Sequence, residues 1–256
     1  MLTAITRKVS SALSNCELSF IERKPIDLEK ARAQHHTYEE LLAKLGARVV
    51  SLQEEPELPD SMFVEDPAIV LDELAVICTL GTETRRKEAP TLAAALEEYR
   101  NLAHIKLPGT LEGGDVLRVG KNLFVGLNRR SNAEGIRQLA VILEKYRYQV
   151  TAVPVTGCLH LKSAVTSLGR NTLLGNRAWF DWKRLEGFEW VDVHPSEAHA
   201  GNCLAIGDSV ILPTSFPKTR EKMESHGFHV LPLDISELQK AESGLTCSSL
   251  LFDVLS

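Results

Sequence analysis

The sequence contains no hydrophobic run that approaches the roughly 18 apolar residues of a membrane span. Its first residues also lack the basic-then-apolar layout of a signal peptide. Basic residues are not in excess, because 29 Lys and Arg stand against 34 Asp and Glu, which gives a formal charge of −5. Proteins that bind nucleic acid usually present a basic face. We therefore expect a protein that binds neither membrane nor nucleic acid.

Cysteine is scarce, and its pattern excludes two further classes of protein. The five cysteines are odd in number and widely spaced, and no two of them form a C-x-x-C pair. A disulfide framework or a structural zinc site would need such pairing, whereas free thiols suit the reducing cytoplasm. Most free cysteines are small buried hydrophobic residues. Position in the fold must therefore decide whether any of them has a chemical role.

What the sequence does contain is an internal repeat. With 256 residues, 44% of them hydrophobic and 25% charged, the chain has the composition of an ordinary globular protein. A unit of strand, strand, helix and strand recurs at spacings of roughly 40 to 50 residues, a period typical of propellers and arrays. The copies cover strands 68–71 and 74–77, helix 91–99 and strand 104–107; strands 114–120 and 123–126, helix 132–146 and strand 150–155; a looser copy over 161–193; and strands 201–207 and 210–212, helix 217–226 and strand 230–233.

A fifth copy is split between the two ends of the chain. Residues 245–252 would supply its first strand, residues 2–6 its second strand, residues 27–45 its helix and residues 49–52 its last strand. Joining the ends in this way closes a ring and removes exposed sheet edges. The sequence therefore predicts one α/β domain over residues 1–256, a five-unit propeller closed where the C-terminal strand meets the N-terminal strand. A doubly wound sheet is the alternative, but it predicts neither the in-register hairpins nor the terminal strand.

The repeat brings chemically active side chains to equivalent positions near the axis. Just before or at the first strand of successive units stand Glu65 and Asp66, Glu112, His160, Asn202 and Cys247. Taken singly, Glu112 could cap a turn, and His160 and Cys247 could be core residues. Taken together, they point to nucleophilic catalysis. A thiol reacts as the thiolate, which a nearby imidazolium or bound cation favours, and a histidine can act as general acid and base.

The charges around this predicted channel indicate the ligand. Acidic residues gather there, namely Asp60, Glu65, Asp66, Glu112 and Asp115, and buried carboxylates need a cation or hydrogen-bond donors. The nearby guanidinium groups of Arg85, Arg86 and Arg130 suit a carboxylate on the same ligand. An amino acid with a cationic side chain has both features.

Seven motifs spread over nearly the whole chain resemble the guanidino-group-modifying enzymes, and among them the dimethylarginine dimethylaminohydrolase family. They are PDSMFVED (59–66), RR (85–86), LEGGD (111–115), NAEG (132–135), LHLKS (159–163), AGNC (200–203) and LTCS (245–248). The resemblance implies a five-bladed α/β propeller of ββαβ units, the pentein fold. It also implies that Cys247 attacks the guanidinium carbon of Nω-methylated arginine, with His160 as acid and base and Glu112 as its partner. Citrulline and a methylated amine would be the products.

The resemblance also implies a set of substrate-binding residues. Asp60, Asp66 and Glu112 would hold the guanidinium, within a motif that also includes Phe63 and Glu65. Arg85 and Arg130 would hold the substrate carboxylate. Leu18 would lie on a lid loop formed by residues 15–24. No metal or organic cofactor is implied, the partner is a small guanidino amino acid, and a homodimer is compatible with the resemblance.

Some positions depart from the family pattern, and other functions stay open. Residues 77–81 lack the Thr-Arg-Pro-Gly turn, Gly201 stands where alanine is expected, and the lid sequence differs. The same nucleophile would also serve an arginine or agmatine deiminase, another guanidine hydrolase or an amidinotransferase. A binding protein for cationic amino acids without catalysis is the alternative from another class.

Overall fold

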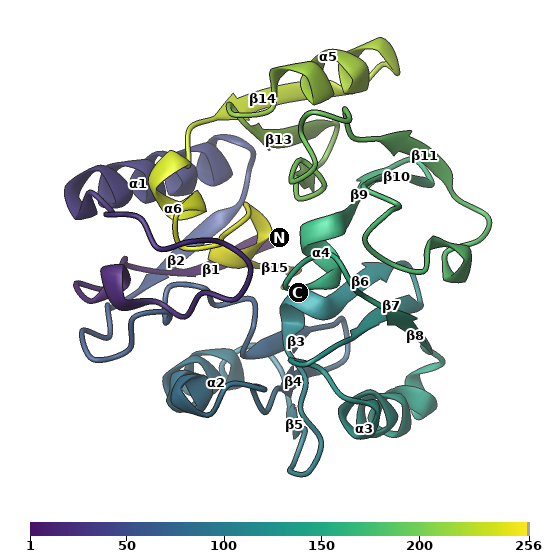
Figure 1. Ribbon diagram of the computed structural model, residues 1–256. Helices are drawn as coiled ribbons and strands as arrows, with labels where there is room; N and C mark the ends of the chain where they lie inside the picture. The colour runs from purple at the N-terminus through teal and green to yellow at the C-terminus, as the bar shows by residue number, and fades with distance from the viewer. Residues whose placement is uncertain (255–256) are drawn as a thin grey trace.

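Three-stranded sheets form the framework of the structure, a computed structural model that describes residues 1–254. Within these residues there are five such sheets. In four of the sheets the second strand in chain order lies in the middle, antiparallel to the first and parallel to the third. In the sheet that joins the two ends of the chain, β1 lies in the middle, antiparallel to β15 and parallel to β2. Figure 1 shows the sheets arranged around a common centre, with α1, α2, α3 and α5 on the outside. The predicted five-bladed propeller is therefore confirmed.

The elements follow one another in the order that the repeat predicts. The strands are β1 (Leu2–Arg7), β2 (Arg48–Leu52), β3 (Ala68–Val70), β4 (Ala75–Ile77), β5 (Leu102–His104), β6 (Val116–Val119), β7 (Asn122–Leu127), β8 (Gln149–Pro154), β9 (Val165–Gly169), β10 (Thr172–Gly175), β11 (Glu189–Asp192), β12 (Leu204–Ile206), β13 (Ser209–Pro213), β14 (His229–Leu233) and β15 (Leu250–Asp253). The α-helices are α1 (Leu28–Lys44), α2 (Ala89–Glu97), α3 (Ala133–Leu143), α4 (Leu161–Ala164), α5 (Pro217–Ser225) and α6 (Ser236–Gln239). The 3₁₀ turns are η1 (Leu13–Asn15), η2 (Glu83–Glu88), η3 (Gly113–Asp115), η4 (Glu144–Tyr146), η5 (Trp182–Arg184) and η6 (Thr246–Ser248). None of the helices within residues 1–254 has the length and apolar character to cross a membrane.

Local signals explain where the two longest helices begin and end. The Asp27 side chain accepts a hydrogen bond from the Lys30 N–H at the start of α1, and Asn132 does the same for Gly135 at the start of α3. Such caps satisfy backbone donors that the helix leaves free. Gly46 follows α1 at φ +92°, a conformation that favours glycine and stops the helix.

The ring closes through β15, as the sequence predicts. β15 pairs antiparallel with β1, so that Phe252 lies opposite Thr3 and Leu250 opposite Ile5. Leu250, Phe252 and Ile5 are buried together in one apolar cluster that also receives side chains from β3 and β4. The two ends of the chain thus complete one sheet, and that sheet packs against the next one.

Two units differ from the expected pattern. The connection between β10 and β11 contains only the 3₁₀ turn η5 and no α-helix, because residues 176–188 are rich in aromatic residues without helical spacing. The strand expected at 104–107 is β5, Leu102–His104. Its register is set by parallel pairing of Ala75 with Leu102, and Lys106 already belongs to the next turn.

One-turn helices, rather than the strands themselves, carry the residues near the axis. η3, α4 and η6 stand directly before the first strands β6, β9 and β15. The sequence predicts a strand from residue 114, but Gly113–Asp115 turns instead, and β6 begins at Val116. A Cβ atom at Gly113 would overlap the backbone oxygen of Glu65. Glycine is needed here because two backbone segments touch.

Candidate active site

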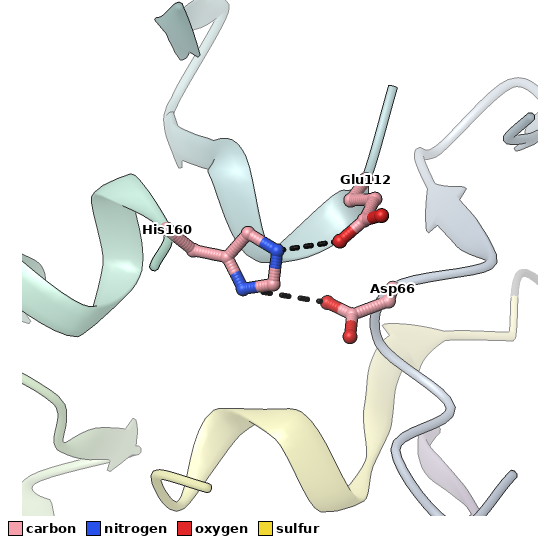
Figure 2. Close-up of side chains that lie close together, drawn as sticks. All are labelled: Asp66, Glu112 and His160. Atoms are coloured by element: carbon pink, nitrogen blue, oxygen red, sulfur yellow. Dashed lines mark hydrogen bonds and ion pairs between the residues drawn. The ribbon is translucent and has the colours of Figure 1, made fainter. Parts of the chain in front are cut away.

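His160 lies between two carboxylates at the centre of the propeller. Its Nε2 is 2.6 Å from Glu112 Oε2, and its Nδ1 is 3.8 Å from Asp66 Oδ1. All three side chains are buried. Figure 2 shows the imidazole ring with one acid at each nitrogen. The three residues come from three different units, so the propeller brings together positions that are far apart in sequence.

The surrounding charges favour the protonated imidazole. Burial by itself lowers the pKa of His160, but the carboxylates of Asp66, Asp115 and Glu112 outweigh it and raise the pKa to about 9. Burial raises the pKa of Glu112, yet the hydrogen bond and charge of His160, with the nearby arginines, hold that pKa well below its usual range. The pair is therefore an imidazolium and a carboxylate at neutral pH, and His160 has a proton to give.

Asp115 fixes the position of His160 through the backbone. Its buried carboxylate accepts hydrogen bonds from the Leu161 N–H at 2.9 Å, from Asn128 Nδ2 at 2.8 Å and from Ser131 Oγ at 2.6 Å. Ser131 Oγ in turn accepts the Glu112 N–H at 3.0 Å. Burial raises the pKa of Asp115 to about 6. This network ties the backbone beside His160 to the backbone of Glu112, and thereby holds their side chains in register.

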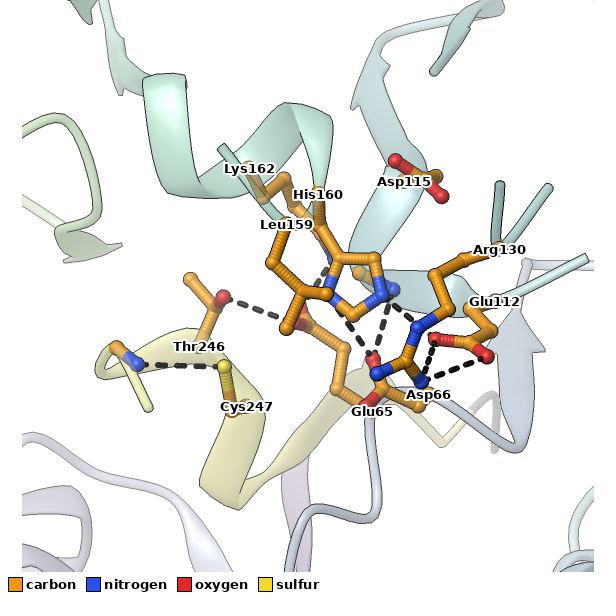
Figure 3. A network of polar contacts seen from close by, with 12 residues as sticks. Glu65, Asp66, Glu112, Asp115, Arg130, Leu159, His160, Lys162, Thr246 and Cys247 are labelled. Carbon is orange, nitrogen blue, oxygen red and sulfur yellow. Dashed lines mark hydrogen bonds and ion pairs between the residues drawn. The ribbon is translucent and has the colours of Figure 1, made fainter. Parts of the chain in front are cut away.

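Cys247 lies in η6 and is half-buried. Its Sγ accepts the Gly244 N–H at 3.4 Å, and its carbonyl oxygen accepts the Glu65 N–H at 3.3 Å. Figure 3 shows the Cys247 side chain in the same region as His160, Glu65 and Asp66. Burial raises the pKa of the Cys247 thiol to about 12, and the charges of Glu65 and Asp66 add to the rise. The site therefore disfavours the thiolate until a cation compensates the acids.

Glu65 joins the Cys247 loop to the neighbouring units. It forms an ion pair with Lys162 and accepts a hydrogen bond from Thr246 Oγ1 at 2.8 Å. Burial raises the pKa of Glu65 despite the Lys162 ammonium. Asn202 completes the ring, because its amide oxygen accepts the Thr246 N–H at 3.1 Å and its amide nitrogen donates to the Lys162 carbonyl at 2.9 Å. All five units thus meet around the residues singled out from the sequence.

Two buried arginines pair with the acids of the site. Arg85 Nη1 lies 2.8 Å from Asp66, and its Nε and Nη2 form a two-pronged contact with Glu88 at 2.9 Å each. Arg130 Nη1 lies 3.3 Å from Glu112 Oε1. Each arginine leaves part of its N–H groups for another anion, because a guanidinium carries five N–H donors.

Leu18 lies on a segment without regular secondary structure, residues 16–27, which we call the lid segment. Leu18 and Cys247 pack against the same apolar cluster, which includes the buried side chains of Met62 and Phe63. Asp60 is buried next to the lid segment and accepts the Glu17 N–H at 3.1 Å. The structure therefore gathers Leu18, Asp60 and Phe63 on the lid side of the nucleophile.

Sequence reasoning missed two charged partners of these residues. Glu88 is buried against Arg85, and its pKa rises to about 7 chiefly through burial. This pair could have been predicted from the sequence, because Glu88 follows Arg85 by three residues, a spacing that brings side chains together in a helical turn. Lys162 belongs to a recognised motif, but only the fold shows that it pairs with Glu65. No sequence spacing links residues 65 and 162.

Asp66, Glu112 and His160 also offer three ligand atoms within 4.8 Å of one another. A metal ion there would compete with Arg85 and Arg130, whose positive charges already pair with the two carboxylates. The same carboxylates suit a planar guanidinium better, because its N–H groups can donate to several carboxylates at once.

Comparison with known proteins places this arrangement in a family. A family model described as N,N dimethylarginine dimethylhydrolase, eukaryotic, matches residues 10–174. An N(G),N(G)-dimethylarginine dimethylaminohydrolase of Pseudomonas aeruginosa is 34% identical over 228 residues, covering 88% of this chain and 90% of the relative. The chain belongs to the dimethylarginine dimethylaminohydrolase family. The enzyme of that name in Streptomyces coelicolor is 35% identical over 247 residues, 96% of this chain and 95% of the relative.

Solved structures agree with the family assignment. A cysteine-to-serine variant of the Pseudomonas aeruginosa enzyme, in complex with citrulline, matches with a TM-score of 0.93 and 32% identity, covering 98% of this chain and 100% of the other. The N-terminal domain of ArgZ, a cyanobacterial arginine dihydrolase, matches with a TM-score of 0.87 at 19% identity, covering 98% of each chain. At that identity the second match shows the fold alone. The family membership makes this chain a hydrolase of the dimethylargininase type.

Proposed function

We propose that the protein hydrolyses Nω-methylated arginine to citrulline and methylamine or dimethylamine, with Cys247 as nucleophile. The observation that carries the proposal is a charged His160, hydrogen-bonded to Glu112, in the same site as the half-buried Cys247 thiol, whose pKa is raised by desolvation and by the charges of Glu65 and Asp66. The relatives from Pseudomonas aeruginosa and Streptomyces coelicolor bear the name of this activity, and one related structure contains citrulline.

The substrate itself supplies the charge that activates the thiol. Burial, with the charges of Glu65 and Asp66, raises the pKa of Cys247 to about 12, so the thiol is protonated at neutral pH. A guanidinium bound between Asp66 and Glu112 adds a positive charge beside Sγ, which lowers the thiol pKa. The Cys247 thiol therefore becomes a reactive thiolate only when a cationic ligand is bound.

The reaction then proceeds in two steps that share one proton carrier. The Cys247 thiolate forms a C–S bond to the guanidinium carbon, and the C–N bond to the methylated nitrogen breaks as the His160 imidazolium protonates the leaving amine. A water molecule then attacks the same carbon while neutral His160 takes its proton. The C–S bond breaks, the thiolate returns, and the ureido group of citrulline remains.

The remaining charged residues position the two ends of the substrate. Asp60, Glu65, Asp66 and Glu112 line the guanidinium side. Arg85 and Arg130 are proposed to hold the substrate carboxylate, Arg130 with the N–H groups that Glu112 does not use. Leu18 and Phe63 supply apolar contacts for the methylene chain, since both belong to the apolar cluster against which Cys247 packs.

A substrate panel tests the proposal. Asymmetric dimethylarginine, monomethylarginine, arginine and agmatine are incubated with the enzyme, and citrulline and the released amine are measured. We expect citrulline with dimethylamine or methylamine. Ammonia released faster from free arginine than dimethylamine from the methylated substrate would identify a deiminase instead, and transfer to an added amine would identify an amidinotransferase.

A pair of variants separates the enzyme from a binding protein. Cys247→Ala should abolish turnover while keeping affinity for the substrate, whereas Cys203→Ala, at another buried thiol, should keep both. Rapid quenching of the wild-type reaction should trap an adduct on Cys247, detected by mass spectrometry. Full turnover by Cys247→Ala would reject Cys247 as the nucleophile.

The cellular setting and assembly are further parts of the proposal. All five thiols are free, which supports residence in the cytoplasm. A homodimer is also part of the proposal, since Leu107 and Val141 expose apolar side chains that such an interface could cover. We propose that residues 1–256 form one catalytic domain. Light scattering during gel filtration gives the oligomeric state, and a single cooperative unfolding transition is expected for one domain.

A further inference from the structure

The lid segment is held by carboxylates instead of by its own backbone. Within residues 17–27, as the structure describes them, no backbone N–H is recorded bonding a backbone carbonyl. The amides that do have partners all donate to acidic side chains. Glu17 donates to Asp60, Ser19 and Phe20 donate to Glu242, and Asp27 donates to Glu237. Most side chains of this segment are exposed, so apolar packing holds it only at a few positions.

Among these acids, Glu242 is the one that accepts two backbone N–H groups, and they belong to consecutive residues. Its Oε2 accepts the Ser19 N–H and its Oε1 accepts the Phe20 N–H, both at 2.8 Å. Neither the family motifs nor the repeat singled out this residue. Hydrogen bonds to an ionised carboxylate are roughly twice as strong as neutral ones. One side chain thus clamps two consecutive amides of the lid segment, which Arg23 also ties to the carbonyl oxygens of Ser14 and Cys16 at 2.6 Å each.

The clamp stands on the loop that carries the nucleophile. Glu242 precedes Cys247 in the connection between α6 and η6, and its backbone has a φ of +60°. Such a conformation is unusual for a residue other than glycine and is worth a functional explanation when found near an active site. In this conformation the Glu242 side chain reaches Ser19 and Phe20.

Glu242 also lines a cavity beside the loop that carries Cys247. A cavity of about 340 Å³ is lined by Phe20 and Glu242 at the lid and by Asn202 and Gly244 further in. The N–H of Gly244 is the group that contacts Cys247 Sγ. Movement of the lid segment away from Glu242 would widen this cavity beside the loop that carries Cys247.

We propose that Glu242 is a positioning residue that keeps the lid segment closed over the bound substrate. This inference rests on the proposed function. Two other charged contacts of the segment, Glu17 with Asp60 and Ser19 with Arg130, involve residues proposed to bind the substrate. A substrate competes with the lid for those groups, whereas the Glu242 contacts are independent of it. Glu242 therefore holds Leu18 in place when the site is occupied.

The consequence is a change in affinity rather than in chemistry. Without the clamp, the closed state of the lid segment is less populated. The apparent affinity for the substrate falls in proportion to the fraction of molecules that are closed. Losing two charge-assisted hydrogen bonds at a half-exposed position corresponds to a KM roughly tenfold higher. Because Glu242 touches neither Cys247 nor His160, kcat should stay within about twofold of the wild type.

The test compares Glu242→Gln with the matched variant Glu197→Gln. Glu197 also accepts two consecutive backbone amides, those of Lys218 and Thr219 at the start of α5. Within residues 1–254 no hydrogen bond or ion pair joins Glu197 to the lid segment. Amide hydrogen exchange over residues 17–24 and steady-state kinetics with dimethylarginine are measured for both. For Glu242→Gln we expect faster exchange in this segment and the tenfold rise in KM. For Glu197→Gln we expect wild-type values of both.

A second variant separates the clamp from the strained backbone. Glu242→Gly removes the carboxylate and places at φ +60° the residue that tolerates it, so it should fold at least as well as the wild type. It should show the same faster exchange and the same rise in KM. Wild-type exchange over residues 17–24 in both variants, or faster exchange with an unchanged KM, would overturn the proposal. The exchange measurement needs no turnover, so it tests the clamp even if the assigned substrate is wrong.

Discussion

Three carboxylates surround His160, and their charge decides what this one residue can do. Asp66, Glu112 and Asp115 overcome the effect of burial and raise its pKa to about 9. The thiol of Cys247 has a still higher pKa of about 12. The reactive combination of thiolate and imidazolium is therefore a minor form at neutral pH, and the bound guanidinium must increase it.

The pH dependence of kcat/KM follows from these two groups. Below pH 9 His160 stays charged while the thiolate fraction grows with pH, so kcat/KM should rise. Above about pH 9 His160 loses its proton, and the two effects cancel, so the rise should stop. Glu112→Gln removes a charge that raises the His160 pKa and should move the break to lower pH. A rise that continues unbroken to pH 10.5, or a break that Glu112→Gln does not move, would contradict this assignment.

The same shift makes a prediction about stability. The folded-state pKa of His160, about 9, lies above the ordinary value of about 6.5, so its charge stabilises the fold fully below pH 6.5. That contribution is lost as pH rises through 9. The excess stability of the wild type over His160→Gln should therefore shrink, by up to roughly 3 kcal/mol, between pH 6 and pH 10. Urea unfolding of both proteins at both pH values measures this excess stability. An excess that grows as the pH rises would contradict a raised pKa of His160.

At the scale of single elements, the one-turn helices before the first strands position the site. η3 places Glu112 at its start, and α4 does the same for His160. The turn of η3 passes so close to the segment of Glu65 that only glycine fits at position 113. The Gly201 that departs from the family pattern has a similar reason, because a Cβ there would overlap the Ala164 carbonyl oxygen.

Gly113→Ala should accordingly damage both stability and activity. The added methyl group must push the Glu65 backbone away, and overpacking of this kind costs about 1–3 kcal/mol. Since Glu65 and Asp66 move with it, kcat/KM should fall by at least about tenfold. Gly120→Asn is the control, because position 120 is exposed with φ +61°, which asparagine tolerates. Thermal unfolding and kinetics report both effects; a Gly113→Ala enzyme equal to the control would disprove the steric argument.

At the scale of the whole molecule, the propeller depends on closure of its ring. β15 pairs with β1, and its side chains Leu250 and Phe252 fill an apolar cluster shared with β3 and β4. The Phe252 ring also packs edge to face against Tyr99, with centroids 5.3 Å apart. The strand that follows Cys247 thus anchors the nucleophile loop to two units at once.

Removing residues 250–256 keeps Cys247 but removes this closing strand. We expect a loss of several kcal/mol of stability, since burial of one Leu and one Phe side chain contributes about 1.5–3 kcal/mol each. Activity should fall to background because η6 loses its anchor. Phe252→Ala should show an intermediate loss of stability. A truncated protein that melts with the wild type would show that ring closure does not stabilise the fold.

Local patterns in the sequence were sufficient for the architecture. Hairpins in register, capped helices and an apolar strand near the end of the chain predict the five units and their closure, because strand alternation and turn chemistry are local properties. The missing helix between β10 and β11 escaped prediction, since a loop with aromatic residues still fits the length of the repeat. The equivalent positions of the repeat also identified Glu112, His160 and Cys247 as a candidate set.

The partners of those residues were decided only by the tertiary structure. Lys162 meets Glu65, and Glu242 meets Ser19 and Phe20, across separations that no local pattern encodes. The pKa values of His160 and Cys247 likewise depend on burial and on charges contributed by other units. The sequence by itself determined which residue types stand at the axis of the propeller. Their distances, burial and electric field exist only once the ring has closed, because Coulomb interactions and desolvation depend on position in space rather than along the chain.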